Sequence, residues 1–208
     1  MLRTSIPAPP CLRQARTLSR CARGSVDQGR HRPMGKFVCR VIAQPLTADA
    51  WAPFGWLPVA DTDPGDGKGR LSFAWGDPHV NVIAHRADEI ERRDGALVCG
   101  EMFRHDSHTQ ALLVLDARAV VAVAPGGHPL GAPGDAGVIR AFELEPLDAF
   151  VLHAGTWHWG PFPVDAETVH LYNVQGRRYC EDNMKVDVAA VLGEVEISVA
   201  QPDAMPAR

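Results

Sequence analysis

Short apolar runs alternate with polar, turn-forming stretches along most of the chain beyond residue 36. Five runs of strand length follow one another closely between residues 109 and 174: TQALLVLD, AVVAVAP, GVIRAFEL, DAFVLHAG and ETVHLYNV. Glycine- and proline-rich stretches such as APGGHPLGAPGDAG lie between them, as turns do between antiparallel strands. Many short strands with few helices favour an antiparallel sandwich or barrel over a parallel βαβ sheet. The pattern therefore predicts an all-β fold with minor helix.

The region before these runs predicts further β structure. FVCRVIAQPL has the β-branched content of a strand, and TADAWAPFG predicts a short helical turn that Thr47 caps and Pro53 stops. RLSFAWG and VNVIAHR are predicted as short strands, and ADEIERRDG as a second helical turn. DTDPGDGKGR is polar and rich in glycine, which predicts a loop.

The first 35 residues differ in composition from the rest of the chain. They are rich in Arg, poor in acids and interrupted by Pro, and they show no hydrophobic period. We therefore expect a disordered extension or an over-long start, with an organellar transit peptide as the alternative. We expect one domain over residues 36–200 and a frayed tail over 201–208.

Charge and cysteine usage exclude several classes of protein. Residues 1–36 carry a balance of +7, so with a total formal charge of −4 the rest of the 208-residue chain carries −11. An acidic domain is a poor partner for nucleic acid, and no run of about 18 apolar residues predicts a membrane span. The five cysteines form no C-x-x-C pair, which argues against a disulfide framework or a thiolate zinc site. We therefore expect a reducing, cytoplasmic compartment.

Two polar clusters flank predicted core strands. The first is GEMFRHDSHTQALLVL, in which alternation places His108 and Gln110 on the same side if the strand already runs there. The second is FVLHAGTWHWGPF, in which His153 and His158 are an odd number of residues apart, so a turn near Gly155 is needed to bring His158 inward. Imidazoles are common metal ligands and titrate near neutral pH. The clusters therefore indicate either metal binding or acid/base chemistry, against the alternative that each histidine has only a structural role.

The other notable side chains have structural alternatives too. Trp157, Trp159 and Phe162 are typical of a packed core more than of a substrate platform. Arg140 lies within an apolar run, where a buried guanidinium needs an anion, and Arg104 is a second arginine of this kind. The anion is either a structural carboxylate or a substrate carboxylate.

In order along the chain, PLTADAWAPFG, FRHDSHTQALLVL, AVVAVAP, GVIRAFEL and LHAGTWHWGPFPV resemble the ureidoglycolate lyase family, once called ureidoglycolate hydrolase, over about residues 42–188. The resemblance implies a cupin fold, that is, a double-stranded β-helix or jelly-roll barrel. It also implies a homodimer that cleaves ureidoglycolate to glyoxylate and urea in purine breakdown. The partner is then a small carboxylate substrate, with no nucleic acid or membrane.

The resemblance also implies roles for single residues. His105, Gln110 and His158 match positions that would bind a divalent metal (nickel, manganese or zinc) or, without metal, the hydroxy-carboxylate directly. The preceding histidine of the family matches His153, so we expect His153 or His108 to act as acid or base. The arginine of the family's RAF motif matches Arg140, so Arg140 or Arg104 would hold the substrate carboxylate.

The chain departs from the family pattern at several positions. Phe103 stands where the family has Glu, Trp159 where it has a second histidine, and Val174 where it has an acid, while His108 is an additional imidazole. Two alternatives therefore stay open: an enzyme of the same fold acting on another small carboxylate, and a non-catalytic small-molecule-binding barrel.

Overall fold

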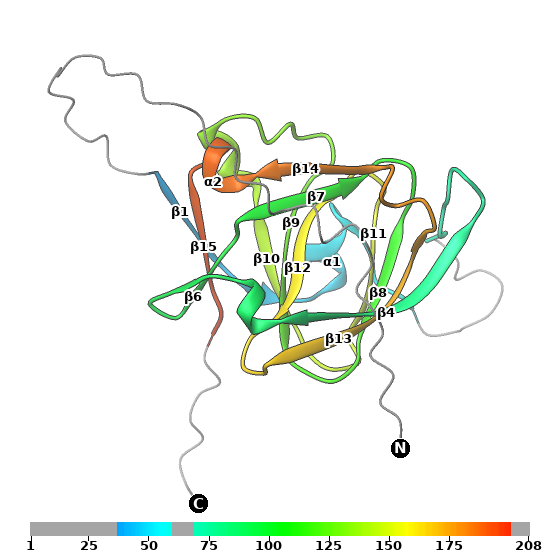
Figure 1. Cartoon of the computed structure of the whole chain (residues 1–208), viewed down its shortest axis with the longest axis horizontal. Helices are drawn as coiled ribbons and strands as arrows, with labels where there is room; N and C mark the ends of the chain where they lie inside the picture. The colour runs from blue at the N-terminus through cyan, green and yellow to red at the C-terminus, as the bar shows by residue number, and fades with distance from the viewer. Residues whose placement is uncertain (1–36, 60–68, 201–208) are drawn as a thin grey trace, which may run out of the picture. The chain divides into compact units, whose positions relative to one another are not determined.

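The computed structural model describes residues 37–59 and 69–200. The predictions for the N-terminal extension and for the tail over 201–208 lie outside the described residues, as does most of the predicted DTDPGDGKGR loop. Apart from short helical turns, the described part consists of strands joined by turns (Figure 1). The all-β prediction is confirmed.

Two large sheets form the body of the fold. The six-stranded sheet has the order β14 (Asn183–Asp187), β7 (Glu101–His105), β12 (Trp157–Pro163), β9 (Ala119–Ala124), β10 (Arg140–Leu144) and β2 (Gln44–Pro45). The five-stranded sheet has the order β3 (Gly55–Trp56), β11 (Ala149–Leu152), β8 (Gln110–Val114), β13 (Thr168–Gly176) and β4 (Pro78–Arg86). Their central strands, β7-β12-β9-β10 and β4-β13-β8-β11, interleave along the chain, which is the connectivity of a jelly roll. The predicted jelly-roll barrel is therefore observed.

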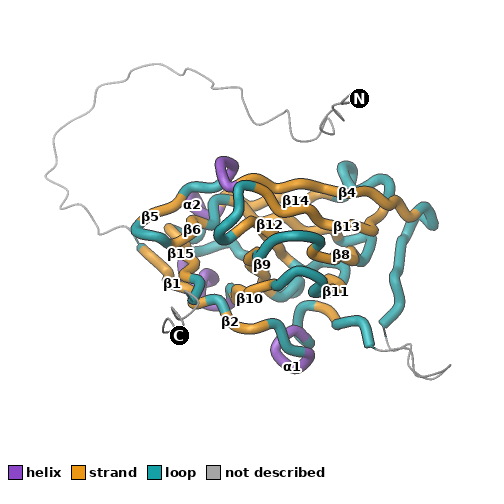
Figure 2. The backbone as a smooth tube through the Cα atoms, turned by 90° about the horizontal axis from the view of Figure 1, so that it is seen from below, coloured by secondary structure: helices purple, strands orange, loops and turns teal. Residues whose placement is uncertain are grey.

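A third, smaller sheet adds a layer. It has the order β1 (Val38–Ile42), β15 (Glu194–Ser198), β6 (Ala96–Val98) and β5 (Arg92–Arg93), and it is seen at one end of the tube in Figure 2. Its buried residues Leu97 and Ile197 pack with Val120, Trp157 and Trp159 of the six-stranded sheet. A short helix, α2 (Val188–Val191), contributes Val188 to the same core. The sequence predicts β1, but not β14, α2 or β15.

The local predictions have mixed outcomes. Helix α1 (Ala48–Trp51) begins where expected, because the Thr47 side chain accepts a hydrogen bond from the Ala50 N–H group. The predicted turn in ADEIERRDG is a 3-10 helix at Ala87–Glu89. RLSFAWG does not form a strand and makes only an isolated bridge between Phe73 and His108. Among the described cysteines, Cys39 and Cys99 are free, and Cys180 is disulfide-bonded, which the cysteine spacing did not predict.

The space between the two large sheets is divided into two ends. One end is apolar and is filled by aromatic and aliphatic side chains, among them Trp51, Phe54, Phe142 and Phe150. Toward the other end the same strands carry buried polar groups: β8 begins at Gln110 and continues inward with Leu112, and β13 runs from Leu171 to Asn173 and Gln175.

No helix among the described residues is long and apolar enough to cross a membrane.

Candidate functional site

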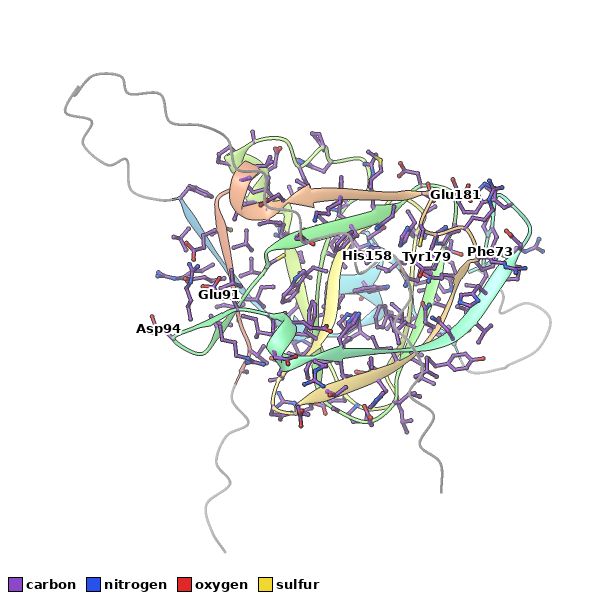
Figure 3. All side chains as sticks on the ribbon, in the orientation of Figure 1. Phe73, Glu91, Asp94, His158, Tyr179 and Glu181 are labelled. Carbon is purple, nitrogen blue, oxygen red and sulfur yellow. The ribbon has the colours of Figure 1, made fainter. Side chains whose placement is uncertain are left out.

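Three histidines from three segments meet at the polar end of the barrel. His105 ends β7, His108 lies in the following loop, and His158 is the second residue of β12. The His105 ring centroid lies 4.6 Å from that of His108 and 5.4 Å from that of His158. All three are buried, with exposed fractions of 7%, 1% and 9% respectively. Figure 3 labels His158 on β12, in the central part of the molecule.

A turn between β11 and β12 places His158 in this cluster. Strand β11 ends at Leu152, Gly155 adopts φ +83°, and the Gly155 N–H group donates to the His105 carbonyl oxygen at 2.6 Å. His158 is then in register with Val123, whose side chain lies in the core between the sheets. The redirecting turn predicted near Gly155 is therefore present. His153 lies in this turn, whereas His158 lies in β12.

Asp182 completes the group. It lies between β13 and β14, and its Oδ2 atom accepts a hydrogen bond from the Ser107 N–H group at 2.6 Å. The same oxygen lies 3.4 Å from His108 Nδ1. One potential ligand atom from each of His105, His108 and Asp182 lies within 4.8 Å of the other two. The arrangement thus brings two imidazoles and one carboxylate together beside the loop between β7 and β8.

Burial keeps these imidazoles neutral. Desolvation, helped by the positive charge that neighbouring His158 and His108 would carry, lowers the pKa of His105 to about 2. Desolvation lowers the pKa of His158 to about 4, and it also lowers the pKa of His108, although the Asp182 carboxylate opposes that shift. At neutral pH each ring therefore presents a lone pair. The His158 Nδ1–H group donates to the Thr156 carbonyl at 3.1 Å, so the lone pair of that ring is on Nε2.

Several of the buried polar atoms have no hydrogen-bond partner. They are His105 Nδ1, both ring nitrogens of His108, and Gln110 Oε1. Because an unpaired buried polar atom costs roughly 1–3 kcal/mol, such atoms are rare unless a ligand, ion or water completes them. A divalent metal, which the resemblance implies, suits these neutral nitrogens and the Asp182 carboxylate. The residues present therefore fit a metal.

A chain of amides lines the wall beside the histidines. The Gln110 Nε2–H group donates to Asn173 Oδ1 at 2.9 Å, and the Asn173 Nδ2–H group donates to Asn81 Oδ1 at 2.7 Å. These bonds leave Gln110 Oε1 as an unpaired acceptor. Gln110 is thus on the inner wall as the sequence predicts, but its side chain is held by the five-stranded sheet.

Aromatic rings surround the histidines on the loop side. The Phe73 ring stacks on His108, and Trp75 contacts His108 with a centroid separation of 6.0 Å. Tyr179 meets the His105 ring edge-on at 6.4 Å. Figure 3 shows Tyr179 and Phe73 to one side of His158. These rings contribute to the burial of His105 and His108, and burial lowers the pKa of both imidazoles.

Three residues proposed from the sequence lie elsewhere. His153 is exposed, and its ring contacts Trp56 at 5.4 Å. Arg140 is also exposed, and its guanidinium donates to the Gly137 and Ile139 carbonyls, so the premise that it is buried in an apolar strand is wrong. Arg104 packs over the Trp157 ring and lines a surface pocket with Lys185. The structure does not bring these side chains into the histidine cluster.

The positions that depart from the family pattern fall on different faces. Trp159 packs with Leu97 and Ile197 in the core between the six-stranded sheet and the third sheet, which we call the outer core, because it alternates with His158 along β12. Phe103 is the β7 partner of His158 and shares its face. Phe103 is therefore the departure that can alter the site, whereas Trp159 has a packing role.

Asp182, Asn173 and Asn81 are site residues that were not predicted from the sequence. Asp182 follows a strand, in the arginine-rich stretch RRYCED, where a carboxylate is expected to be a solvated surface group. The alternation Leu171, Asn173, Gln175 in one strand was a usable signal, since amides recurring every second residue share one face.

Sequence comparisons give no family for this chain: no protein-family model and no curated protein matches it. Similar solved structures include a dTDP sugar isomerase from Desulfovibrio desulfuricans G20, with a TM-score of 0.41 and 10% identity over 67% of this chain and 90% of that chain. An L-ribose isomerase from Cellulomonas parahominis, determined with L-ribose, has a TM-score of 0.36 and 16% identity over 61% of this chain and 65% of that one. The ligand-free form of an L-ribose isomerase from the same organism has a TM-score of 0.33, 17% identity, and coverage of 59% and 75%. At such low values these similarities carry no functional argument.

Proposed function

We propose that this protein is a lyase that cleaves the C–N bond of ureidoglycolate to give glyoxylate and urea. The observation that carries the proposal is the buried cluster of neutral imidazoles at the polar end of the barrel. Unpaired acceptors there, including Gln110 Oε1, suit the N–H groups of a ureido substituent. The order of motifs that resembles ureidoglycolate lyases supports the same substrate.

The chemistry requires two proton transfers. A base removes the hydroxyl proton of the substrate, the oxygen forms the C=O bond of glyoxylate, and the C–N electron pair leaves with the nitrogen. An acid protonates that nitrogen, which releases urea. We assign these proton exchanges to His158, because its Nδ1–H group donates to the Thr156 carbonyl and Nε2 therefore carries the lone pair that can accept a proton. A bound metal would polarise the hydroxyl and the carboxylate.

Glyoxylate release from racemic ureidoglycolate tests the proposal. The full chain is assayed after chelation and again with nickel, manganese or zinc, beside a protein-free reaction. We expect turnover above the spontaneous rate, and a loss of about 100-fold or more in His158→Gln, the scale of a positioned acid/base group. His153→Gln is the matched control, because His153 is exposed on Trp56. Turnover at the spontaneous rate under all conditions would contradict the assignment.

A second candidate is an enzyme of the same fold acting on another small carboxylate. The observation that favours it is Phe103, an apolar ring on the His158 face where the resembling family has an acid. A thermal-shift screen of small hydroxy- and keto-carboxylates separates the two, because a ligand that binds only the native state raises Tm. Saturable binding without product would instead favour the non-catalytic barrel.

We also propose the homodimer that the resemblance implies. The outer face of the five-stranded sheet carries exposed apolar side chains in register, Val80 and Val82 on β4 and Tyr172 on β13. Light scattering on the full chain measures the oligomeric state. We expect a dimer that Val82→Lys weakens, and a monomer at all concentrations would contradict the proposal.

A further inference from the structure

The arrangement of the buried histidines points to a binding site other than the one the resemblance implies. We propose that His105, His108 and Asp182 together bind one divalent transition-metal ion at the polar end of the barrel. The resemblance implies His105, Gln110 and His158 instead. The two ligand sets share only His105, so experiment can separate them.

The geometry favours the first set. Its three ligand atoms lie within 4.8 Å of one another, close enough for small side-chain movements to bring them around one ion. Asp182 already has one oxygen fixed by the Ser107 N–H group, which holds the carboxylate against the loop that carries His108. Hydrogen bonds of this kind to a ligating carboxylate are typical of the surroundings of metal sites.

The unpaired atoms support it independently. His105 Nδ1 and both His108 ring nitrogens are buried without a hydrogen-bond partner, and the His108 side chain is fully enclosed. His108 Nδ1 lies 3.4 Å from Asp182 Oδ2, so the imidazole and the carboxylate face each other at the edge of hydrogen-bonding distance. An ion between an imidazole and a carboxylate would satisfy both groups.

Gln110 is a weaker ligand in this structure. Its amide is tied to Asn173, which is tied in turn to Asn81, so the wall of the five-stranded sheet positions it. Asp182 also brings a negative charge, which a neutral amide does not, and a divalent ion in a buried site gains more from that charge. Two imidazoles and a carboxylate suit zinc, nickel, manganese or iron(II).

The ion would supply a positive charge that the protein otherwise lacks inside the barrel. No Arg or Lys belongs to the buried polar groups of the described residues. If the proposed lyase activity holds, the metal would take the carboxylate-binding role first expected of Arg140 or Arg104. This last step rests on the proposed function, whereas metal binding itself can be tested without substrate.

The test measures metal binding by the full chain. Chelator-stripped protein is titrated with Zn²⁺, Ni²⁺, Mn²⁺ or Co²⁺ by calorimetry, and metal content is measured after gel filtration by elemental mass spectrometry. Co²⁺ adds visible absorption bands that report on the ligands. We expect one ion per chain for at least one metal, and a loss of affinity in Asp182→Asn of more than about tenfold, which even changes around metal ligands cause.

Matched variants distinguish the two ligand sets. Gln110→Ala and the exposed control His153→Gln should retain the metal, and His108→Asn should lose it as Asp182→Asn does. Circular dichroism and the Tm of the metal-free protein establish whether each variant is folded. If Asp182→Asn does not fold, His108→Asn tests the same ligand set. Absence of stoichiometric binding, or loss in Gln110→Ala with retention in Asp182→Asn, would overturn the proposal. Metal binding without glyoxylate release would overturn only the proposed lyase activity.

Discussion

The two ends of the barrel interior are built on the same strands but hold different chemistry. At one end Trp51 meets the rings of Phe142 and Phe150 edge-on at about 5 Å, and these side chains are fully buried. At the other end His105, His108 and Gln110 are also buried, yet they retain ring nitrogens and an amide oxygen without hydrogen-bond partners. The apolar end resembles an ordinary core, whereas the polar end keeps unsatisfied groups that a structural role does not require.

The difference indicates that the apolar end contributes stability and the polar end contributes the candidate binding site. Burial of large aromatic side chains provides the free energy that holds the two sheets together. That stability allows the opposite end to tolerate desolvated imidazoles. The comparison predicts that substitutions at the apolar end change stability alone, while those at the polar end change binding and pH dependence.

The largest expected effect is on the apolar end. Phe142→Ala removes a fully buried ring that packs on Trp51 and Phe54, so the free energy of unfolding should fall by about 3–5 kcal/mol. Urea denaturation followed by tryptophan fluorescence measures it, with Val59→Ala at an exposed position as control. A loss below about 1 kcal/mol would show that this end is not a close-packed core.

The polar end should make stability depend on pH. The folded pKa values of His105 and His158, about 2 and about 4, lie below the unfolded value. Between these values and pH 6.5 the unfolded chain therefore binds more protons, and stability decreases as pH falls. From pH 7 to pH 5 we expect a loss of about 2 kcal/mol for each of the two histidines.

Urea titrations at pH 7, 6 and 5 in the presence of a chelator measure this dependence. His158→Gln should have a shallower dependence than the parent protein, while Phe142→Ala should keep the same slope at a lower stability. Equal stability at pH 5 and pH 7 would mean that the imidazoles are not desolvated.

The amide chain should contribute a smaller amount. Asn173→Ala leaves the Gln110 Nε2–H group and Asn81 Oδ1 without partners, so we expect a loss of about 1–3 kcal/mol in the free energy of unfolding. A double-mutant cycle with Gln110→Ala tests the coupling between the two amides. The double variant should lose less free energy of unfolding than the sum of the two single variants. Strict additivity would show that the two amides do not interact.

The smallest effect concerns the two faces of β12. Trp159→Phe changes a side chain in the outer core, so we expect unchanged metal affinity and a modest loss of stability. Phe103→Glu places a carboxylate on the His158 face and should alter the affinity. Metal titration of the two variants measures both, and a larger change in affinity for Trp159→Phe than for Phe103→Glu would contradict the assignment of faces.

Predictions from the sequence were best where the pattern is local. The strands β8, β9, β10 and β11 lie within apolar runs of strand length, and β13 extends its run by two residues. Thr47 caps α1 through a contact three residues along the chain. RLSFAWG failed because its apolar residues pack on the His108 ring from a loop instead of joining a sheet. The roles of Arg140 and His153 were inferred from type and order, which do not report on which side of the sheet a side chain lies.

The sequence by itself determined the all-β class and the strand positions at the centre of the barrel, and it indicated His105, His108 and His158 as candidates for one site. The strands follow from the lengths and spacing of the apolar runs, whereas the roles of the histidines came from their clustering and from the resemblance. Only the tertiary structure decided which polar residues meet. Asp182 reaches His108 across 74 residues of chain through the β13–β14 loop, and Asn173 reaches Gln110 through the register of β13 with β8. Contacts of this kind depend on how the sheets pair and close, and no local pattern encodes them.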